Sequence, residues 1–299
     1  MELRRIKCTH FSRAYDFTTS EKYIVGCTGR RAKVLDKNLN LVSDIDGLDY
    51  VYSARFSPDG KKLLLILNGN GFYTYDMETC QKNKTTVKKP YNYNLEGRGC
   101  WSHDGENLLI PVMNSQNLMS ALRCYNSENT DEFCDLLIEK YVIIDIFKLE
   151  NSDRYLIIGY PREGKQPNYA IYYDGEQFEE YLLQDTEGDI VFHSTVDSET
   201  GIITLYLHSK CCRYQWNGEL LECLQFPKII GYVEKYVKSS CGKYLYTATE
   251  NGFYILDSDT KKILAAAKEE YGAQNCEELE KGLVAVSTWG GVKIYEIIE

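Results

Sequence analysis

Short apolar runs separated by polar turns recur along the whole chain. Residues 56–76 show the pattern most clearly, with FSPDG, the apolar run KLLLIL, NGNG and FYTYD in succession. Pro, Asp-Gly and Asn-Gly favour tight turns, and apolar runs this short have the length of strands. The pattern therefore predicts a strand, a tight turn, a second strand, a glycine-rich turn and a third strand.

The same unit recurs at a regular spacing. A turn precedes most copies of its second strand, as at residues 57–60, 102–105 and 239–242. The third strand tends to end on an acid, at Asp36, Asp76, Asp174 and Asp257. A period of about 40 to 48 residues is typical of repeats that each contain four short strands. The second strand can be placed seven times, at residues 22–25, 62–65, 107–110, 154–157, 201–204, 243–246 and 282–285.

These units resemble the repeats of WD-repeat and related β-propeller proteins, in which a turn, an apolar strand and a glycine turn lead to a strand ending in Trp-Asp. Leu35-Asp36, Tyr75-Asp76 and Leu256-Asp257 stand in place of the Trp-Asp dipeptide, and no Gly-His pair precedes the units, so the repeats are propeller-like. The resemblance covers nearly the whole chain. It implies an all-β fold, a seven-bladed β-propeller of four-stranded antiparallel blades in a single domain over residues 1–299.

The seventh repeat ends before a fourth strand, whereas residues 3–8 form a strand that no other repeat uses. Placing that N-terminal strand at the outside of the last blade closes the ring and removes an exposed edge. Residues 259–271 contain good helix formers, but the period requires a strand and a loop there. The expected blades are 15–47, 48–89, 94–139, 141–184, 189–226, 231–267, and 273–299 with residues 1–10.

The composition of the chain limits the classes of partner that we expect it to bind. The formal net charge of −10 disfavours nucleic acid, because binding to phosphates needs clustered Lys and Arg. The basic groups at residues 4–7 and 82–89 are interpreted as solvated faces. No apolar stretch is long enough to cross a bilayer. Eleven cysteines, together with a charged start lacking an apolar run, predict mostly buried, reduced thiols and a cytoplasmic protein.

Loops at one end of a propeller usually carry its function. The loops after the second strands and between the blades are rich in Tyr, Arg and Trp, which are common anchors of protein interfaces. We therefore expect a protein or peptide partner to bind there, although any one of these side chains can instead pack between blades. The candidates are Arg30, Arg31, Tyr50, Tyr52, Tyr91, Tyr93, Arg98, Trp101, Tyr160, Arg162 and Trp289.

Signals for catalysis, metal or cofactor binding are weak. The four histidines form no catalytic triad or HExxH pair, and the Gly-Asn-Gly at residues 69–71 precedes a strand instead of a helix. Cys211, Cys212, Cys223 and His208 lack the spacing of a zinc site. The sequence thus favours a non-enzymatic scaffold without catalytic residues or cofactor. The alternative is a lactonase-like propeller hydrolase or lyase, in which Asp49, Glu96, Asp189 and Glu234 would hold a divalent cation.

Overall fold

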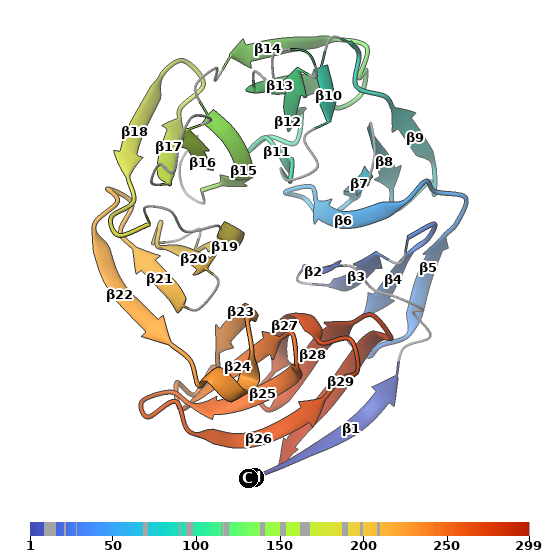
Figure 1. Ribbon diagram of the computed structural model, residues 1–299. Helices are drawn as coiled ribbons and strands as arrows, with labels where there is room; N and C mark the ends of the chain where they lie inside the picture. Colours follow the sequence, from blue (N-terminus) through green and yellow to red (C-terminus); the bar gives the residue numbers. More distant parts are fainter. Residues whose placement is uncertain are drawn as a thin grey trace. The chain divides into compact units, whose positions relative to one another are not determined.

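The computed structural model confirms the predicted fold class, a seven-bladed β-propeller (Figure 1). Each blade is a four-stranded antiparallel sheet, and we number the blades 1 to 7 in chain order. In blades 1 to 6 the strands follow one another along the chain, whereas blade 7 takes its outer strand from the N-terminal segment. The structure describes residues 1–8, 16–20, 22–27, 29–67, 71–89, 91–93, 98–114, 116, 120–137, 141–149, 154–161, 168–186, 191–197, 200–207 and 210–298.

The chain divides into two compact units. The first unit comprises Met1–Ala54, Tyr206–Cys211 and Leu224–Glu299, and the second comprises Arg55–Leu205 and Cys212–Cys223. Blades 1, 6 and 7 belong to the first unit and blades 3 and 4 to the second, whereas blades 2 and 5 contain residues of both. The single domain expected over residues 1–299 stays a prediction.

The three blades of the first unit are built from twelve strands. Blade 1 contains β2 (Asp16–Thr19), β3 (Tyr23–Cys27), β4 (Ala32–Asp36) and β5 (Leu41–Ile45). Blade 6 contains β23 (Val233–Lys238), β24 (Tyr244–Thr249), β25 (Gly252–Asp257) and β26 (Ile263–Lys268). Blade 7 contains β27 (Ala273–Glu280), β28 (Leu283–Thr288), β29 (Gly291–Ile298) and β1 (Glu2–Cys8).

In the second unit, the first strand of blade 3 is divided into two pieces that both pair with the next strand. Blade 3 contains β10 (Tyr91–Tyr93), β11 (Cys100–Trp101), β12 (Asn107–Asn114), β13 (Ser120–Asn126) and β14 (Phe133–Leu137). Blade 4 contains β15 (Tyr141–Lys148), β16 (Tyr155–Pro161), β17 (Tyr169–Tyr173) and β18 (Phe178–Leu182).

The two remaining blades have residues in both units. Blade 2 contains β6 (Val51–Phe56), β7 (Lys62–Leu67), β8 (Phe72–Asp76) and β9 (Lys82–Thr85). Blade 5 contains β19 (Val191–Val196), β20 (Ile203–Leu207), β21 (Lys210–Tyr214) and β22 (Leu220–Gln225). Within the described ranges the one helical element is a 3₁₀ turn, η1 (Lys228–Ile230), and no described helix has the length and apolarity to cross a membrane.

The serine–acid turns are held by their own side chains. The Ser57 hydroxyl donates to Asp59 Oδ1 at 2.7 Å, the Lys61 amide donates to the same oxygen at 3.0 Å, and Gly60 takes a φ of +70°. Ser102 and Asp104 repeat these bonds in blade 3. Each turn thus satisfies its backbone locally, which explains why the motif predicts a strand connection so well.

The acid that ends a third strand has a similar local task. Asp76 Oδ1 accepts hydrogen bonds from the Thr79 and Glu78 amides at 2.7 and 2.9 Å, and these bonds, the Thr79 bond most of all, hold the pKa of Asp76 below its usual range. Asp257 accepts the Thr260 amide at 2.7 Å in the corresponding turn of blade 6. The repeated acid therefore caps the turn that leads into the fourth strand.

The core of each unit lies on the first three strands of its blades, and the second and third strands have apolar side chains buried on both faces. In the second unit one cluster contains Leu109, Leu122, Ile146, Ile157 and Ile171. In the first unit Ala248, Phe253, Cys276, Val286 and Tyr295 form another. Burial of both faces produces the near-continuous apolar runs of the sequence. β26 is a strand despite its helix-forming residues, as the repeat period required, and it pairs antiparallel with β25.

The N-terminal strand completes blade 7, as predicted. β1 pairs antiparallel with β29 from Glu2 opposite Ile298 to Cys8 opposite Lys293 (Figure 1). Leu3 packs against the first-unit core cluster, and the Arg4 Nε atom donates to Glu296 Oε2 at 2.7 Å. β1 therefore covers the edge that β29 would otherwise expose.

Candidate functional site

Five of the candidate residues lie in the first unit. Arg30, Arg31 and Tyr50 are exposed, and Tyr52 is half-buried. A bridge between Gly29 and Val51, together with a 3.2 Å bond from the Leu48 amide to the Arg30 carbonyl, holds the two connecting segments together. Trp289, in the turn between β28 and β29, is 38% exposed.

The other six candidates belong to the second unit. Trp101 is only 3% exposed, and its Nε1 donates to the Arg55 carbonyl at 3.2 Å, so this side chain is packed and hydrogen-bonded. Arg98 and Tyr160 are half-buried. Tyr91 and Tyr93 lie on β10 but their side chains fall outside the described part, as does Arg162. The partner-binding role of the whole set stays a prediction.

Exposed large apolar side chains gather on the loops of blades 6 and 7. Ile229 is 74% exposed, Tyr271 66%, Tyr232 41% and Trp289 38%. We call these four residues the aromatic loop surface. Single exposed apolar residues are ordinary, but several on neighbouring loops mark a surface that can bind another molecule.

Glu250 and Asn251 hold the first half of this surface together. The Glu250 amide donates to the Tyr232 carbonyl at 3.1 Å, and Glu250 Oε1 accepts the Tyr232 amide at 3.2 Å. The Asn251 Nδ2 group donates to the Ile229 carbonyl at 3.4 Å. The turn between β24 and β25 thus anchors the segment that presents Ile229 and Tyr232.

The backbone next to Tyr271 packs closely against the turn that contains Glu250. Gly272 has a φ of +71°, and a Cβ atom there would lie 2.6 Å from the Glu250 carbonyl oxygen. Ala273, the next residue, pairs with Thr288, which immediately precedes Trp289. The turn that contains Glu250 therefore contacts the segment that carries Tyr271. That segment leads into the strand that pairs with the residue before Trp289.

Glu269 fixes the base of the Tyr271 loop. Its carboxylate accepts the Tyr295 hydroxyl at 2.8 Å and forms an ion pair with Lys293, which is largely buried. The Gly272 amide donates to the Glu269 carbonyl at 3.1 Å. The loops that carry the exposed aromatic rings are consequently held by hydrogen bonds. Their backbone therefore loses little additional conformational entropy when a partner binds.

Two carboxylates, Glu234 and Glu250, lie close to each other beside this surface. Burial raises the pKa of Glu234, and the nearby Glu250 carboxylate raises it further. Glu234 was one of the four carboxylates of the metal-dependent alternative; Asp49 is exposed, and Glu96 and Asp189 fall outside the described residues. Among the residues that the structure describes, no group of three or more His, Cys, Asp or Glu could hold a metal ion.

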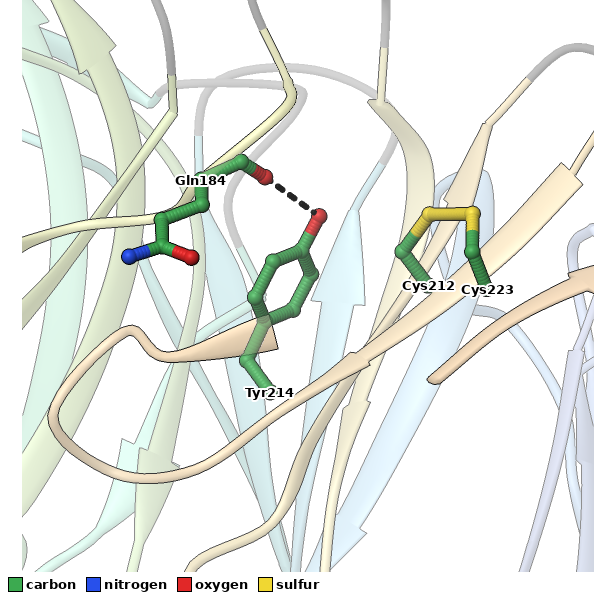
Figure 2. Close-up of a disulfide and its surroundings, with 4 residues drawn as sticks. All are labelled: Gln184, Cys212, Tyr214 and Cys223. Carbon is green, nitrogen blue, oxygen red and sulfur yellow. Dashed lines mark hydrogen bonds between the residues drawn. A yellow bond between two sulfur atoms is a disulfide. The ribbon is translucent and has the colours of Figure 1, made fainter. Parts of the chain in front are cut away.

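The sequence predicted mostly reduced thiols, but two of the cysteines form a disulfide. Cys212 and Cys223, on neighbouring strands of blade 5, are joined by a disulfide with a Cα–Cα distance of 4.3 Å (Figure 2). Antiparallel pairing brings the two residues opposite one another, which the sequence separation alone does not reveal. Next to this bond, the Tyr214 hydroxyl donates to the Gln184 carbonyl at 3.0 Å (Figure 2).

Comparison with known proteins does not extend this description. No family model matches the chain, and no curated protein matches it either.

Sequence reasoning named Trp289 as a site residue but did not include Ile229, Tyr232 or Tyr271. A usable signal was present, because Tyr232 and Tyr271 occupy segments between blades, as Tyr50 does. Only the hydrogen bonds of Glu250 and the close approach at Gly272 show that these segments meet.

Proposed function

We propose that the chain is a non-enzymatic protein-interaction scaffold of the WD-repeat-like propeller type, and that the aromatic loop surface binds a basic segment of a partner protein. The observation that carries this proposal is the group of four exposed apolar side chains on hydrogen-bonded loops. Tyr and Trp bury large areas at a small cost in side-chain entropy, so they commonly dominate binding energy. The cytoplasmic location expected from the sequence belongs to the same proposal.

The carboxylates beside the surface favour a partner segment that carries positive charge. Glu234 and Glu250 lie next to the surface, and neither takes part in the ion pairs found among the described residues. A Lys or Arg side chain would neutralise these carboxylates and could also lie over the rings of Tyr232 and Tyr271. The net charge of −10 would favour the approach of such a segment.

The proposal is tested by comparing variants in a pull-down from native lysate. Tyr271→Ala/Trp289→Ala removes two anchors, whereas Trp216→Ala removes a comparably exposed Trp of the second unit and serves as the matched control. The segment of the recovered protein that binds is then mapped and its Kd measured at low and high salt. Loss of a hot-spot residue costs about 2 kcal/mol, which corresponds to roughly a thirtyfold weaker Kd.

We expect wild type and Trp216→Ala to recover the same protein, the double variant to lose it, and salt to weaken the Kd of the mapped segment. Retention by a folded double variant would show that the surface is wrong. Recovery of a segment without Lys or Arg would refute the charge argument. A melting temperature that rises with calcium, with no protein recovered, would favour the metal-dependent hydrolase or lyase instead.

A further inference from the structure

A second pair of cysteines lies between the same two strands of its blade as the disulfide does. Cys124 on β13 and Cys134 on β14 are direct partners in the antiparallel register of blade 3, and both are free thiols. β13 and β14 are the third and fourth strands of blade 3. β21 and β22, which carry Cys212 and Cys223, are the third and fourth strands of blade 5. Two blades thus carry a cysteine pair between the same two strands.

The backbone geometry permits a bond at this second pair. The Asn126 amide donates to the Glu132 carbonyl at 3.0 Å, and pairs alternate along an antiparallel ladder, so Cys124 and Cys134 form a hydrogen-bonded pair. Cα atoms in such a pair lie about 5.5 Å apart, inside the range of about 4.4 to 6.8 Å that disulfides span.

The neighbouring pairs fix this register on both sides. Arg123 and Asp135 precede and follow the two cysteines, and Arg123 Nε lies 2.6 Å from Asp135 Oδ1. On the other side the rings of Tyr125 and Phe133 have centroids 5.5 Å apart. A slip of the strands would break both contacts, so the two sulfur atoms are kept next to each other.

We propose that Cys124 and Cys134 are a redox modification site, which forms a second cross-strand disulfide by exchange with a low-molecular-weight disulfide such as oxidised glutathione. The site is reversible, because excess thiol reverses the exchange. It is independent of the aromatic loop surface and of the function proposed for it.

Two exchanges complete the reaction. The exposed Cys134 thiol loses its proton and attacks one sulfur of glutathione disulfide, which forms a mixed disulfide and releases one glutathione. Cys124 then loses its proton and attacks the Cys134 sulfur, forming the Cys124–Cys134 bond and releasing the second glutathione. The two protons leave with the two glutathione thiols, so the protein is oxidised by two electrons and glutathione disulfide is reduced by two.

The environment of each thiol determines this order. Burial raises the pKa of Cys124 to about 11, and the adjacent Cys134 contributes to the shift, so Cys124 is protonated at neutral pH. Cys134 is exposed and is the thiol that the reagent can reach. Cys124 therefore acts as the resolving thiol, and the rate of ring closure rises with pH.

The Cys212–Cys223 disulfide and the proposed Cys124–Cys134 disulfide each join the outer strand of a sheet to the strand beside it. β14 ends the strand order of blade 3 and β22 ends that of blade 5. An outer strand has one hydrogen-bonded neighbour, so it opens more readily than an inner one. A bond across β13 and β14 holds the outer strand in place when its hydrogen bonds open.

Peptide mapping tests the site directly. The full-length chain is reduced, equilibrated in glutathione buffers of increasing oxidised fraction, quenched with acid, alkylated and digested without reductant. We expect two linked peptide pairs, Cys124–Cys134 and Cys212–Cys223, each lacking two hydrogens relative to the reduced form. The exposed Cys80 and Cys241 serve as internal controls, because they should acquire glutathione or alkyl groups without any link.

Variants separate the two steps. Cys124→Ser should trap one glutathione on Cys134, and Cys134→Ser should abolish this link while leaving Cys212–Cys223 intact. In wild type, hydrogen exchange of the β14 amides should slow at least about threefold on oxidation. Two alkylated thiols at positions 124 and 134 under conditions that oxidise Cys212 and Cys223 would overturn the proposal. A mixed disulfide that persists in wild type would do the same, and both results come from wild type even where a variant does not fold.

Discussion

Arg123 offers the sharpest test of how the second unit is stabilised. This side chain is 2% exposed and yet carries a charge. Its Nε and Nη2 atoms donate to the two carboxylate oxygens of Asp135 at 2.6 and 2.8 Å, and Nη1 donates to the Lys88 carbonyl at 3.2 Å. The guanidinium carbon also lies 4.1 Å from the centre of the Phe133 ring.

The perturbation is Arg123→Met, which keeps much of the aliphatic packing but removes the charge and these three hydrogen bonds. Removing one partner of a buried ion pair costs about 3 to 5 kcal/mol, since the other partner is left uncompensated. The Asp135 side chain is 24% exposed and can recover some hydration, which places the expected loss near the lower end, about 3 kcal/mol. Asp135→Asn keeps the side-chain volume and should cost about 1.5 kcal/mol.

Urea unfolding followed by circular dichroism measures these free energies. The double variant Arg123→Met/Asp135→Asn should be more stable than the sum of the two losses predicts, by about 2 kcal/mol, because the residues act on each other directly. Arg213→Met is the matched control. It also breaks an Arg–carboxylate pair, with Glu222, but both side chains are exposed, so the loss should stay within about 1 kcal/mol.

The reasoning would be refuted if Arg123→Met cost no more than Arg213→Met. Strictly additive losses in the double variant would also contradict it, since they would mean that the Arg123–Asp135 contact has no energetic weight.

Four further predictions follow from the fold and its turns. Deleting residues 1–10 removes β1 from blade 7 and should lower the melting temperature by at least about 5 °C, so an unchanged Tm in a thermal scan would contradict the closure. Gly272→Ala forces a Cβ atom against the Glu250 carbonyl at positive φ, and urea unfolding should show a loss of at least about 2 kcal/mol. The Ser239 hydroxyl and then the Lys243 amide lower the pKa of Cys241. Alkylation of Cys241 by iodoacetamide should therefore reach its half-maximal rate at a lower pH than alkylation of a free cysteine peptide. If Ser239→Ala left the pH of half-maximal rate unchanged, the Ser239 hydroxyl would not be the cause. Replacing both Cys212 and Cys223 by Ser opens a loop with a sequence separation of 11 and should cost about 2 to 3 kcal/mol in oxidising buffer, with no difference from wild type once reductant is added.

The features that the sequence predicted correctly are those encoded by neighbouring residues. Ser57 and Asp59 build their turn without help from distant segments, and Asp76 caps the next turn in the same way. The seven blades and the role of β1 followed from such signals, because most blades repeat them and the last repeat lacked a strand.

The exposure of particular aromatic side chains could not be predicted in this way. Trp101 and Trp289 both belong to the candidate set, but Trp101 is buried and hydrogen-bonded to the Arg55 carbonyl, whereas Trp289 is exposed in a turn. The frame that Glu250 builds around Tyr232 depends on hydrogen bonds between segments that are 18 residues apart. Cross-strand register, which places Cys212 against Cys223, is likewise set by the pairing of strands and not by the local pattern.

The pairing of β1 with β29 has a consequence for how the protein is made. Arg4 and its partner Glu296 are separated by 292 positions, so β1 is synthesised long before the strand with which it pairs. At a synthesis rate of about 5 to 20 residues per second, that interval lasts roughly 15 to 60 seconds. During this time β1 has no partner strand, and blade 7 can be assembled only after the other six blades have been translated.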